Sequence, residues 1–600
     1  MRSGNSYFVN SPMLAAASQV GPQRMKYLLV TGGVCSSLGK GVTTSSIGAL
    51  LRQSGFHVSA IKIDPYINVD AGLMSPFEHG EVYVLADGGE VDLDLGNYER
   101  WLRVRLSRGH NITTGKVYET LIQKERQGGF LGKTVQVIPH VTDDVVRRVV
   151  ETAEIAVDGS GMKPQICLIE LGGTIGDIES APFVEALRQL RFSIPPEDFC
   201  LAHVTYLPTM GESQKTKPTQ HSCRTLLSLG MSPDFLVCRS EGPLTGDARR
   251  KISSLVGLQE KYIFDAHNCG SLYEVPILFH SQDLVAKIVH KMKLDVTKPS
   301  APAIGIPTID ELRSFAQMCT SKTSRTIDIA FVGKYCDGGT DAYFSVMQAF
   351  EHASLAAQVR INFLWIESES LEGESSAADE LRQQLTSMNG IFVAGGFGNR
   401  GIEGKVIAAR IARERKIPYL GVCLGMQIAL IEMGRHLLGL PDATSEEFDS
   451  EKGAPAKSQH HVIIYMPEID RNMMGANMRL GAREAHITAP GSIMQTIYGN
   501  AQKVTERHRH RYEFNMAYLE QFRKAGVIFS AADDPAFGKD TRVEAIELST
   551  AVHPYFLGIQ YHPEFMTWVT DPSPPYAAFV AAAAGVPNTL QKEGNTRRTA

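Results

Sequence analysis

Short apolar runs alternate with amphipathic, helix-like stretches from Met25 to about Lys293. The apolar runs are strand-like and include KYLLVTGG, HVSAIKID, ICLIELGG, LAHVTYLP and FLVCRS. Strands that alternate with helices predict a parallel sheet with helices packed on its faces. We therefore expect a first α/β domain over residues 25–295.

A second alternation begins at Arg325 with IDIAFVGKY and continues through IFVAGGFG and IPYLGVCLG. The stretch between the two is rich in Pro, Ser and Thr, which predicts a linker with one or two helical turns. Six hundred residues also exceed what one hydrophobic core usually holds. The predicted organisation is an extension (1–24), a first domain (25–295), a linker (296–324), a second domain (325–585) and a polar tail (586–600).

The first 24 residues contain no acidic residue, several serines and only two arginines, Arg2 and Arg24. A transit peptide is one interpretation of this composition. A disordered extension is favoured, because arginine is sparse and Pro and Gly interrupt any amphipathic helix.

Composition restricts the partners that this chain can have. A net charge of −5 argues against nucleic-acid binding through bulk electrostatics, and no apolar run approaches the ~20 residues that cross a membrane. Nine cysteines, an odd number without metal-ligand spacing, are typical of free thiols in a reducing compartment. We expect a cytoplasmic protein with no nucleic-acid or membrane partner.

A glycine-rich loop, TGGVCSSLGKGVT, follows the apolar run Tyr27–Val30. Glycines let backbone N–H groups turn toward phosphates, the next helix adds its N-terminal dipole, and Lys40 can neutralise the β- and γ-phosphates. The loop departs from the strict P-loop pattern, because Gly41 stands where Ser or Thr usually binds magnesium. The alternative is a strand–helix turn without a ligand.

The missing hydroxyl raises the question of which residues hold a metal. Asp92, Asp94 and Glu170 are acidic residues near the ends of apolar runs, where parallel α/β sheets form their ligand crevice. Magnesium prefers such hard oxygen ligands together with several waters. Each carboxylate alone is more often a helix cap or a surface charge.

Two lysines and several hydroxyls surround a proline in the segment KTKPTQ (residues 215–220), and Lys251 follows later. These residues could bind a second polyanion. For an isolated KTKP the interpretation as a solvated loop is favoured over binding.

A cysteine lies in the sequence YLGVCLGMQ (residues 419–427), which has the G-x-C-x-G form of a nucleophile elbow. His562 can deprotonate the Cys423 thiol, and Glu564 can orient the imidazole ring. Gly396 in the sequence VAGGFGNRG, together with the N–H of Leu424, can bind an oxyanion. A buried packing cysteine is the alternative for any single thiol.

The run ERHRHRYE (residues 506–513) is unusually charged. Nucleic-acid binding is a poor interpretation, because the run is short, is flanked by acidic residues and belongs to an acidic chain. A recognition loop for a carboxylate substrate is favoured, since arginine side chains match carboxylates.

Taken together, these segments resemble the CTP synthase family. The matching segments are TGGVCSSLGKG, KIDPYINVDAG, MSPFEHGEVYVLADGGEVDLDLGNYERW, ELGGTIGDIES, KTKPTQHS, GGFGNRGIEG, YLGVCLGMQ, ERHRHRYE and QYHPEF. They occur in the family's order over roughly residues 25–570. The resemblance implies a P-loop-type, parallel-sheet amidoligase domain followed by a flavodoxin-like class I glutamine amidotransferase domain.

The resemblance also implies a reaction. ATP would phosphorylate the 4-oxygen of UTP, glutamine hydrolysis would release ammonia, and ammonia passing through the interior would displace the phosphate to give CTP. Mg²⁺ would act with ATP, GTP would activate glutamine hydrolysis, and CTP would be a feedback inhibitor. The family's assembly is a homotetramer that can stack into filaments.

The resemblance also implies roles for individual residues. The glutaminase triad would be Cys423, His562 and Glu564, and Lys40 would act in phosphoryl transfer. ATP would contact Ser37, Leu38, Gly39, Lys40, Gly41, Val42, Asp94, His267, Asn268 and Cys269, and the metal would bind Asp94 and Glu170. UTP or CTP would contact Ser36, Asp177, Ile178, Glu179, Lys215, Thr216, Lys217, Pro218, Thr219, Gln220 and Lys251. Glutamine would contact Gly396, Leu424, Gly425, Met426, Gln427, Glu447 and Arg511, and the ammonia passage would be lined by Pro76, His79 and Val82.

Departures from the family pattern are few. Cys35 replaces a small aliphatic residue, and residues 475–477 read Gly-Ala-Asn where the family usually has Gly-Gly-Thr. Three other functions remain as alternatives: an ATP-dependent amidotransferase of the cobyrinate amidase type, a non-enzymatic scaffold, and a P-loop partition ATPase. KTKPTQ with Lys251 suits a second triphosphate, the intact triad argues against a scaffold, and a partition ATPase leaves that triad unexplained.

Overall fold

The fold is taken from a computed structural model of the chain. The structure describes residues 24–211, 213–295, 305–321, 325–338, 340–449, 458–467 and 477–588. The predicted extension except for Arg24, most of the predicted tail, and residues 296–304 and 322–324 of the predicted linker lie outside these ranges. Gly475 and Ala476, at the second departure from the family pattern, also lie outside them.

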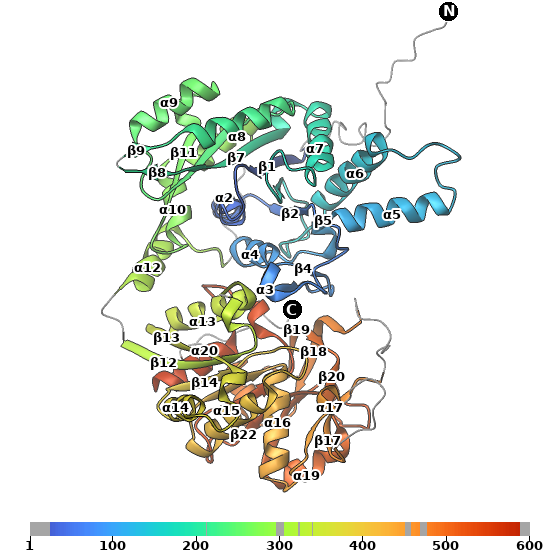
Figure 1. The fold of residues 1–600 in the computed structure, drawn as a ribbon, viewed down its shortest axis with the longest axis vertical. Coiled ribbons are helices and arrows are strands. Elements are labelled where there is room, and N and C mark those ends of the chain that lie inside the picture. Colours follow the sequence, from blue (N-terminus) through green and yellow to red (C-terminus); the bar gives the residue numbers. More distant parts are fainter. Residues whose placement is uncertain are drawn as a thin grey trace, which may run out of the picture. The chain divides into compact units, whose positions relative to one another are not determined.

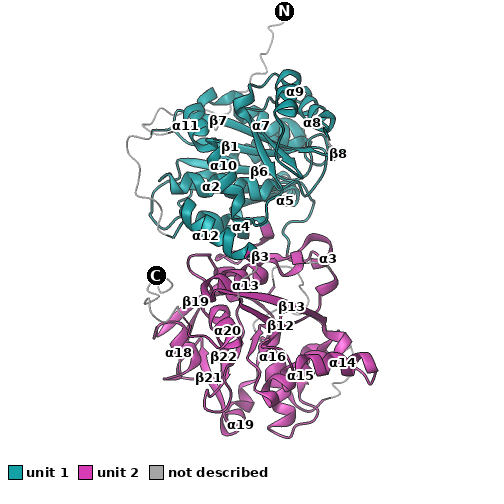
Figure 2. Cartoon of the chain, turned by 90° about the vertical axis from the view of Figure 1, so that its left-hand side faces the viewer, with its two compact units in different colours: residues 1–71, 94–320 teal, residues 72–93, 321–600 magenta. Residues whose placement is uncertain are grey.

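The chain folds into two compact units (Figure 2). The first unit comprises residues 1–71 and 94–320, and the second comprises residues 72–93 and 321–600. The predicted domain boundaries stay a prediction, and the units differ from them in one respect. Residues 72–93 group with the second unit, although they fall within the range predicted for the first domain.

A seven-stranded sheet forms the centre of the first unit (Figure 1). Its order is β11-β10-β7-β1-β6-β2-β5, and every neighbouring pair is parallel. The strands are β1 (Lys26–Gly32), β2 (Val58–Asp64), β5 (Asn111–Thr113), β6 (Ile166–Leu171), β7 (Phe199–Leu207), β10 (Phe235–Ser240) and β11 (Ile263–His267). The predicted parallel sheet of the N-terminal half is confirmed.

Helices cover both faces of this sheet. They are α2 (Lys40–Gln53), α4 (Leu93–Leu102), α5 (Thr114–Arg126), α6 (Thr142–Ala153), α7 (Ala181–Ser193), α8 (Lys217–Ser228), α9 (Gly246–Val256), α10 (Glu274–Ser281), α11 (Leu284–Met292) and α12 (Ile309–Thr320). Leu29 and Ile61 belong to a core that includes Val145 of α6 and Leu187 of α7. The strands are nearly continuous apolar runs because both of their faces are buried. A small hairpin, β8 (Thr209–Met210) with β9 (Ser213–Gln214), follows β7.

A nine-stranded sheet forms the second unit, in the order β13-β12-β14-β15-β23-β22-β21-β18-β19. Its first five strands are parallel: β12 (Arg325–Gly333), β13 (Val359–Glu367), β14 (Gly390–Val393), β15 (Tyr419–Val422) and β23 (Phe556–Ile559). In chain order these strands lie 2-1-3-4-5, which is the flavodoxin-like arrangement. The predicted fold class of the C-terminal half is therefore confirmed.

Four antiparallel strands extend this sheet: β22 (Val543–Leu548), β21 (Val527–Ala532), β18 (Arg479–Ile487) and β19 (Lys503–His510). A separate three-stranded sheet joins β16 (Thr444–Ser445), β17 (His461–Tyr465) and β20 (Tyr512–Phe514). The helices are α3 (Pro76–His79), α13 (Phe344–Ala357), α14 (Ser376–Leu385), α15 (Ile402–Arg415), α16 (Leu424–His436), α17 (Glu446–Asp449), α18 (Ile493–Ile497), α19 (Leu519–Lys524) and α20 (Pro574–Ala584).

Two cores, one on each face, stabilise the large sheet of the second unit. On one face Phe331 and Phe392 pack with Phe350 of α13 and Phe579 of α20. On the other face Val332 packs with residues of α15 and α16. Alternate residues of β12 therefore enter opposite cores, as the two-residue period of a strand requires.

Residues 72–93 join the second unit through α3 and a short antiparallel hairpin, β3 (Val82–Val84) with β4 (Glu90–Asp92). Tyr83 and Val84 are fully buried, and the Tyr83 hydroxyl donates to the carbonyl of Phe565 at 3.2 Å. The N–H of Ala482 donates to the carbonyl of Ala86 at 2.8 Å. This burial explains why the segment belongs with residues that lie several hundred positions later in the chain.

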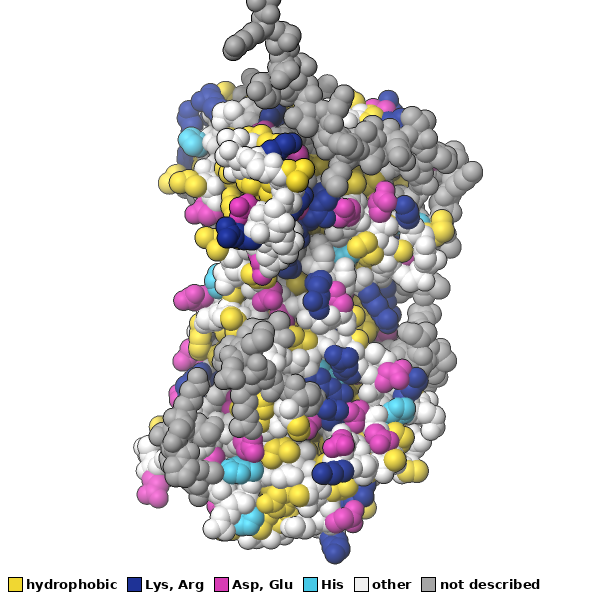
Figure 3. Space-filling view, turned by 90° about the vertical axis from the view of Figure 1, so that its right-hand side faces the viewer, with side chains coloured by type: hydrophobic (Ala, Val, Ile, Leu, Met, Phe, Trp, Pro, Cys, Tyr) yellow, Lys and Arg dark blue, Asp and Glu magenta, His cyan; other side chains and the backbone are white. Residues whose placement is uncertain are grey.

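The surface carries charges of both signs. On the face in Figure 3, basic and acidic side chains are interspersed, and small apolar areas lie between them. This pattern agrees with the small net charge of −5. Within the described ranges, each helix is too short or too polar to span a membrane.

Candidate active sites

Cys423 lies at the sharp turn between β15 and α16 in the second unit. Its φ of +52° and ψ of −104° are strained for a residue with a side chain, and its N–H donates to the carbonyl of Ile559 at 2.7 Å. The helix begins at the next residue, Leu424, so the first N–H groups of α16 lie beside the thiol. This geometry is the predicted nucleophile elbow.

Small residues make this turn possible. A Cβ on Gly425 would lie 2.2 Å from the carbonyl oxygen of Val393, and a Cβ on Gly421 would lie 2.6 Å from the carbonyl oxygen of Gly425. Real side chains do not tolerate such contacts with backbone atoms, so helix α16 can start this close to the sheet only with glycine at both positions.

The structure brings His562 and Glu564 together beside Cys423. Nδ1 of His562 donates to Oε1 of Glu564 at 2.7 Å, and the Tyr576 hydroxyl donates to Oε2 of the same carboxylate at 3.3 Å. A Cβ built on Gly395 would lie 3.1 Å from Cε1 of His562 and 3.6 Å from Cβ of Cys423. The imidazole and the thiol therefore face the same small space.

The electrostatics of His562 favour its protonated form. Burial by itself lowers the pKa of the ring, but the Glu564 carboxylate and the Cys423 sulfur outweigh burial and raise it to about 10. Among the described residues, Nε2 of His562 has no hydrogen-bond partner. One nitrogen is thus fixed by Glu564, and the other is free to exchange a proton with the reacting groups.

The glycine loop after β14 is held by two buried lysines. The Lys334 ammonium donates to the carbonyl of Phe397 at 3.1 Å and also to that of Gly398, and the Lys405 ammonium donates to the carbonyl of Ala394 at 2.7 Å. Burial lowers the pKa of Lys334 to about 8 and that of Lys405 well below its ordinary value. These contacts fix the loop that contains Gly396.

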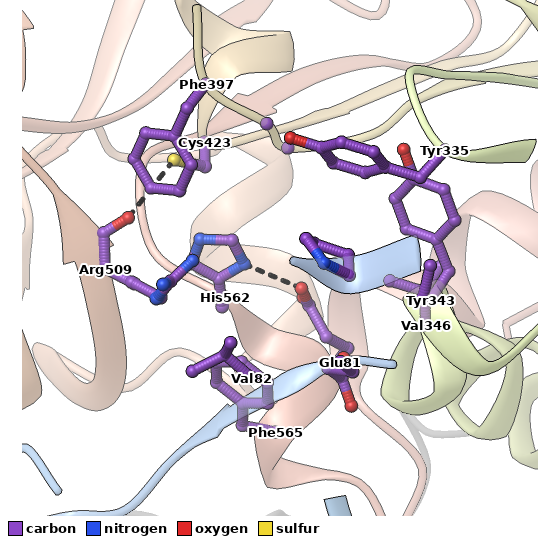
Figure 4. Close-up of a pocket in the computed structure, with 15 residues that line it drawn as sticks. Glu81, Val82, Tyr335, Tyr343, Val346, Phe397, Cys423, Arg509, His562 and Phe565 are labelled. Carbon is purple, nitrogen blue, oxygen red and sulfur yellow. Dashed lines mark hydrogen bonds and ion pairs between the residues drawn. The ribbon is translucent and has the colours of Figure 1, made fainter. Parts of the chain in front are cut away.

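A pocket opens in front of Cys423 (Figure 4). Its lining includes Cys423, His562 and Glu564, the glycine loop from Gly395 to Phe397, and Pro76 and Val82 of the segment 72–93. Figure 4 shows the thiol and the imidazole directed into this space. Of the three residues predicted for the ammonia passage, Pro76 and Val82 line the pocket, and His79 lies at the end of α3 as a half-exposed side chain.

Two further residues predicted to contact glutamine lie near the glycine loop. Oε1 of Glu447, in α17, accepts from the N–H of Gly398 at 2.7 Å. Burial raises the pKa of this carboxyl, while Lys334 and Arg511 lower it. Arg511 lies between β19 and β20, and its Nε donates to the carbonyl of Asn477 at 3.2 Å.

The glycine-rich loop predicted to bind phosphates connects β1 to α2 in the first unit. Val34, Ser37 and Gly39 have positive φ values of 74°, 56° and 82°, which turn the backbone sharply before the helix. Lys40 is the first residue of α2, and its ammonium donates to the carbonyl of Gly173 at 3.0 Å. Burial lowers the pKa of Lys40, and Glu170 opposes this shift.

Gly41 departs from the strict P-loop pattern for a reason that the structure makes clear. A Cβ on Gly41 would lie 2.2 Å from Oδ1 of Asp94, which comes from the first turn of α4. The Asp94 carboxylate therefore occupies the space into which a Ser or Thr side chain would extend. An oxygen ligand is still present at this point, but it comes from another part of the chain.

The two predicted metal ligands lie near one ammonium group. Nζ of Lys62 contacts Oδ2 of Asp94 and Oε1 of Glu170, the latter at 3.1 Å. Oε2 of Glu170 accepts from the Thr44 hydroxyl at 3.3 Å and from the Tyr98 hydroxyl. Two carboxylates beside a phosphate loop fit the oxygen ligands that Mg²⁺ takes together with waters and phosphates. No group of three or more His, Cys, Asp or Glu residues suited to a metal occurs in the described ranges.

The segment KTKPTQ follows β7 and enters α8. Thr216, Thr219 and Gln220 are buried and hydrogen-bonded within the protein, with Nε2 of Gln220 donating to Thr216 Oγ1 at 2.8 Å. Lys215 and Lys217 are exposed and flank the N-terminus of α8. The buried members support the turn, and the two lysines remain available to an anion.

The other residues predicted for nucleotide contacts follow strand ends. Asp177, Ile178 and Glu179 are exposed in the loop after β6, and this loop is tied to β1 because the N–H of Ile175 donates to the carbonyl of Gly32 at 2.9 Å. His267 ends β11 and contacts Asp265 at 2.9 Å. Asn268 and Cys269 follow His267, Ser36 is exposed in the phosphate loop, and Lys251 is exposed on α9.

Most predicted residues of the first unit therefore lie at one edge of its sheet. The segments after β1, β6, β7 and β11 all leave the carboxyl ends of parallel strands, where ligands bind in open α/β sheets. Lys251 and Asp94 come from helices, and Glu170 is the fifth residue of β6.

Sequence reasoning missed several residues at these sites. Lys62 lies within KIDPY, and its position opposite Glu170 follows only from the pairing of β2 with β6. Arg509 lies in the charged run, where its carbonyl accepts from the Cys423 thiol at 3.8 Å. Gln560 precedes the histidine motif by two residues, and its amide donates to Sγ of Cys423 at 3.6 Å. The sequence feature that could have indicated Gln560 is its position two residues before His562.

Comparison with known proteins agrees with this geometry. Residues 26–294 match a family model described as CTP synthase N-terminus, and residues 340–582 match one described as glutamine amidotransferase class-I. CTP synthase of Neurospora crassa is 46% identical over 577 residues, which cover 95% of this chain and 97% of that protein. CTP synthase 1 of Homo sapiens is 45% identical over 579 residues, which cover 95% and 94%.

A solved structure also matches the chain. The glutaminase domain of Trypanosoma brucei CTPS with bound acivicin is 50% identical and covers 44% of this chain and 95% of that chain, with a TM-score of 0.40. Both full-length relatives extend over nearly the whole chain at far more than 30% identity. The chain therefore belongs to the CTP synthase family, the ATP-dependent carbon–nitrogen ligases that convert UTP to CTP with glutamine as nitrogen donor in pyrimidine nucleotide synthesis.

Proposed function

We propose that the second unit hydrolyses glutamine at Cys423 and that the first unit uses ATP to activate UTP. ATP phosphorylates the 4-oxygen of UTP, because this oxygen is otherwise a poor leaving group. Ammonia from glutamine then displaces the phosphate and gives CTP. Internal transfer keeps ammonia in its unprotonated, nucleophilic form.

In the glutaminase reaction, the Cys423 thiolate attacks the side-chain carbonyl carbon of glutamine. The N–H groups of Leu424 and Gly396 stabilise the oxyanion that forms. The C–N bond then breaks, and His562 transfers its Nε2 proton to the leaving nitrogen, which departs as ammonia. Water, deprotonated by the same ring, cleaves the thioester and releases glutamate. The raised pKa of His562, about 10, supports its role as the proton donor.

Glutamine is held at the N-terminus of α16 and at the glycine loop. The contacts that we propose come from Gly396, Leu424, Gly425, Met426, Gln427, Glu447 and Arg511. Arg511 suits the α-carboxylate, because its guanidinium can form two parallel hydrogen bonds with a carboxylate. Glu447 suits the α-ammonium group.

ATP binds at the phosphate loop, through Ser37, Leu38, Gly39, Lys40, Gly41 and Val42, with His267, Asn268 and Cys269 beside the adenine. Asp94 and Glu170 would hold Mg²⁺, which would supply positive charge to the triphosphate. Lys40 stabilises the charge that develops on the transferred phosphoryl group. The overlap between a Gly41 side chain and Asp94 supports this assignment.

UTP binds through Ser36, Lys251 and the segment formed by Lys215, Thr216, Lys217, Pro218, Thr219 and Gln220. The exposed ammonium groups of Lys215 and Lys217 suit its triphosphate. CTP is a feedback inhibitor whose triphosphate overlaps that of UTP, and Asp177, Ile178 and Glu179 contribute to its site.

Ammonia leaves the glutaminase pocket past Pro76, His79 and Val82. The support for this path is that Pro76 and Val82 share a pocket with Cys423 and His562. GTP activates glutamine hydrolysis, and the chain assembles as a homotetramer able to stack into filaments. Nine free cysteines support a reducing, cytoplasmic location. Titration of oligomeric state against ATP, UTP and GTP by sedimentation tests the assembly.

The single observation that carries the proposal is the grouping of Cys423, His562 and Glu564 in one pocket of the second unit. The test is CTP formation from ATP, UTP and Mg²⁺, with either glutamine or ammonium chloride, in the wild type and in Cys423→Ala. The variant should lose synthesis from glutamine and retain synthesis from ammonia. If the wild type hydrolyses glutamine but makes no CTP from ammonia, the first unit has another acceptor and the proposal fails.

A further inference from the structure

Gln560 is a buried amide that contacts the nucleophile. It follows β23, and only 1% of its surface is exposed. Its Nε2 lies 3.6 Å from Sγ of Cys423 and donates a hydrogen bond to the sulfur. The chemistry proposed above, which uses His562, Glu564 and two backbone N–H groups, leaves this contact without a role.

A second glutamine fixes the orientation of this amide. Nε2 of Gln427 donates to the backbone carbonyl of Tyr512 at 3.1 Å and to Oε1 of Gln560 at 3.1 Å. A backbone carbonyl can only accept, so Gln427 must direct its NH₂ group toward Tyr512 and Gln560. The oxygen of Gln560 is therefore the acceptor in this pair, and its NH₂ group must face the sulfur.

Besides His562, the described residues place the Arg509 carbonyl and the Gln560 amide beside the sulfur, and these two groups suit different protonation states. The carbonyl oxygen of Arg509 lies 3.8 Å from Sγ and can interact favourably only with the protonated thiol, which donates to it. The Gln560 N–H can donate to either form, and hydrogen bonds to a charged acceptor are roughly twice as strong as those to a neutral one. Gln560 thus favours the thiolate, and Arg509 favours the thiol.

We propose that Gln560 is a further catalytic residue of the glutaminase, which stabilises the Cys423 thiolate by donating its amide N–H to the sulfur, and that Gln427 is the positioning residue that orients it. This inference rests on the proposed glutaminase role of Cys423. In the pair of Cys423 and His562, the proton that has left the thiol is the one that His562 carries on Nε2, and Gln560 keeps its own protons throughout. The chain of hydrogen bonds from the sulfur ends at the carbonyl of Tyr512, which follows the proposed glutamine-binding Arg511 in the sequence.

The test measures the thiolate directly. Gln560→Met keeps nearly the same volume in a buried site and removes the donor. The rate of alkylation of Cys423 by iodoacetamide is followed against pH by mass spectrometry of its peptide, in the full-length enzyme. The exposed Cys35 is an internal reference in every sample. We expect the half-maximal rate for Cys423 to move up by about one pH unit in the variant, which is a tenfold smaller thiolate population.

The same variant should lower kcat/KM for glutamine hydrolysis by roughly 10- to 100-fold near neutral pH, the range for loss of one hydrogen bond to a charged group. KM for glutamine should change less than kcat. Gln495→Met is the matched control, because that amide accepts from the N–H of Gly491 on the surface of α18. Its alkylation profile should equal that of the wild type.

Two more variants test separately the donor group of Gln560 and the orientation that Gln427 gives to its amide. Gln560→Glu keeps the shape and replaces the donor with an acceptor, so its shift should be at least as large as that of Gln560→Met. Gln427→Met leaves Gln560 free to turn and should give a smaller shift in the same direction. An unchanged Cys423 profile in folded Gln560→Met and Gln560→Glu overturns the inference. If Cys423→Ala still hydrolyses glutamine, the proposed function fails instead.

Discussion

The carboxylate of Glu564 determines the charge on His562. Glu564 is buried and the His562 side chain is only 13% exposed, so water screens their interaction little, and the ring is protonated well above the pH at which a free imidazole loses its proton. The resting site therefore pairs an imidazolium with the Cys423 sulfur. In the proposed glutaminase reaction, a protonated ring can donate to the leaving nitrogen without taking up another proton first.

Glu564→Gln should remove this preference. The pKa of His562 should fall from about 10 toward its ordinary value of 6.5, and glutamine hydrolysis should drop on the order of 100-fold or more, as for loss of a positioned proton donor. Ammonia-dependent CTP synthesis should persist. NMR titration of the imidazole and assays with both nitrogen sources measure the two effects.

Glu564→Gln should also change how the free energy of unfolding depends on pH. A pKa raised in the folded state stabilises the protein fully below the unfolded value of 6.5, and this stabilisation disappears as the pH rises through about 10. The difference in unfolding free energy between wild type and Glu564→Gln should thus be largest near pH 6.5 and shrink toward pH 10. A difference that grows over this window would contradict the charge assigned to His562.

Gly41→Ala tests the contact between the phosphate loop and Asp94. The added methyl group would lie 2.2 Å from Oδ1 of Asp94 and must displace this carboxylate. We expect ammonia-dependent synthesis to fall about 100-fold, the scale for a misplaced group at a reacting centre. Glutamine hydrolysis without nucleotides should be unaffected.

Gly242→Ala is the control for this prediction. Gly242 has open space where the new methyl group would lie, and its φ is not positive. Its synthesis rate should match the wild type. Equal rates in both alanine variants would show that Asp94 has no part in the nucleotide reaction.

At the level of elements, the charged run at residues 506–513 differs from its prediction. We expected a recognition loop, and the prediction was wrong for most of the run, because Lys503–His510 forms strand β19. Glu506, Arg507, His508 and His510 are each at most 2% exposed. Buried charges in a strand require partners from other strands, and the linear sequence does not show which strands supply them.

The hairpin β3–β4 supplies three partners to the arginines Arg507 and Arg509 of this strand. Nη1 of Arg507 donates to the Tyr83 hydroxyl and to the carbonyl of Val84, both at 2.9 Å. Nε of Arg509 donates to Oε1 of Glu90 at 2.8 Å, and its Nη2 donates to the carbonyl of Gly72 at 3.0 Å. Arg509 therefore binds the segment 72–93 near both of its ends, at Gly72 and at Glu90. Its own carbonyl accepts a hydrogen bond from the Cys423 thiol.

Arg509→Met should loosen this segment. Glu90 would be left buried without its guanidinium partner, which costs about 3 kcal/mol or more of unfolding free energy. Synthesis from glutamine should fall relative to glutamine hydrolysis, because Pro76 and Val82 of the segment line the proposed ammonia passage. The ratio of CTP formed to glutamate formed measures this coupling.

Arg523→Met is a suitable control in the same unit. Arg523 pairs with the exposed Glu520 at 2.9 Å, and such surface pairs contribute at most about 1 kcal/mol. Its coupling ratio should stay at the wild-type value. A wild-type ratio in Arg509→Met as well would mean that the segment needs no guanidinium to hold its position.

For the whole molecule, the segment 72–93 gives the second unit a discontinuous sequence. The chain leaves the first unit at Ala71 and re-enters it at Asp94, the proposed metal ligand. Pro76 and Val82, which line the pocket at Cys423, therefore lie in a segment that precedes this proposed ligand in the chain.

A fragment of residues 321–600 should be less stable than the second unit in the full chain. Without Tyr83, Val84 and Glu90, the guanidinium groups of Arg507 and Arg509 lose these three contacts. Its melting temperature and its glutaminase kcat should both be lower. Fusing residues 72–93 to its N-terminus through a flexible linker should restore both values.

The matched control is the same fusion carrying Tyr83→Ala and Glu90→Ala. This version keeps the length and the linker but removes two of the contacts, so it should behave as the unfused fragment does. If the fragment alone is as stable and as active as its fusion, the segment is dispensable for the second unit.

The sequence by itself determined the fold class and the local motifs that carry the candidate catalytic and binding residues. Alternating apolar runs specify parallel strands, because burial on both faces selects continuous apolar residues. The predicted nucleophile elbow at Cys423 was recognisable because the turn requires small residues at fixed positions. The phosphate loop was recognisable for the same reason, since both features are local and their constraints lie within about ten residues.

Only the tertiary structure decided which distant residues meet. The pairing of β2 with β6 brings Lys62 to Glu170. The folding of distant segments against one another brings Asp94 to Gly41 and Gln560 to Cys423. The burial of β3 and β4 beside β19 placed residues 72–93 in the second unit. These contacts depend on long-range packing and on the pairing of buried charges, and neither leaves a periodic signal in the sequence.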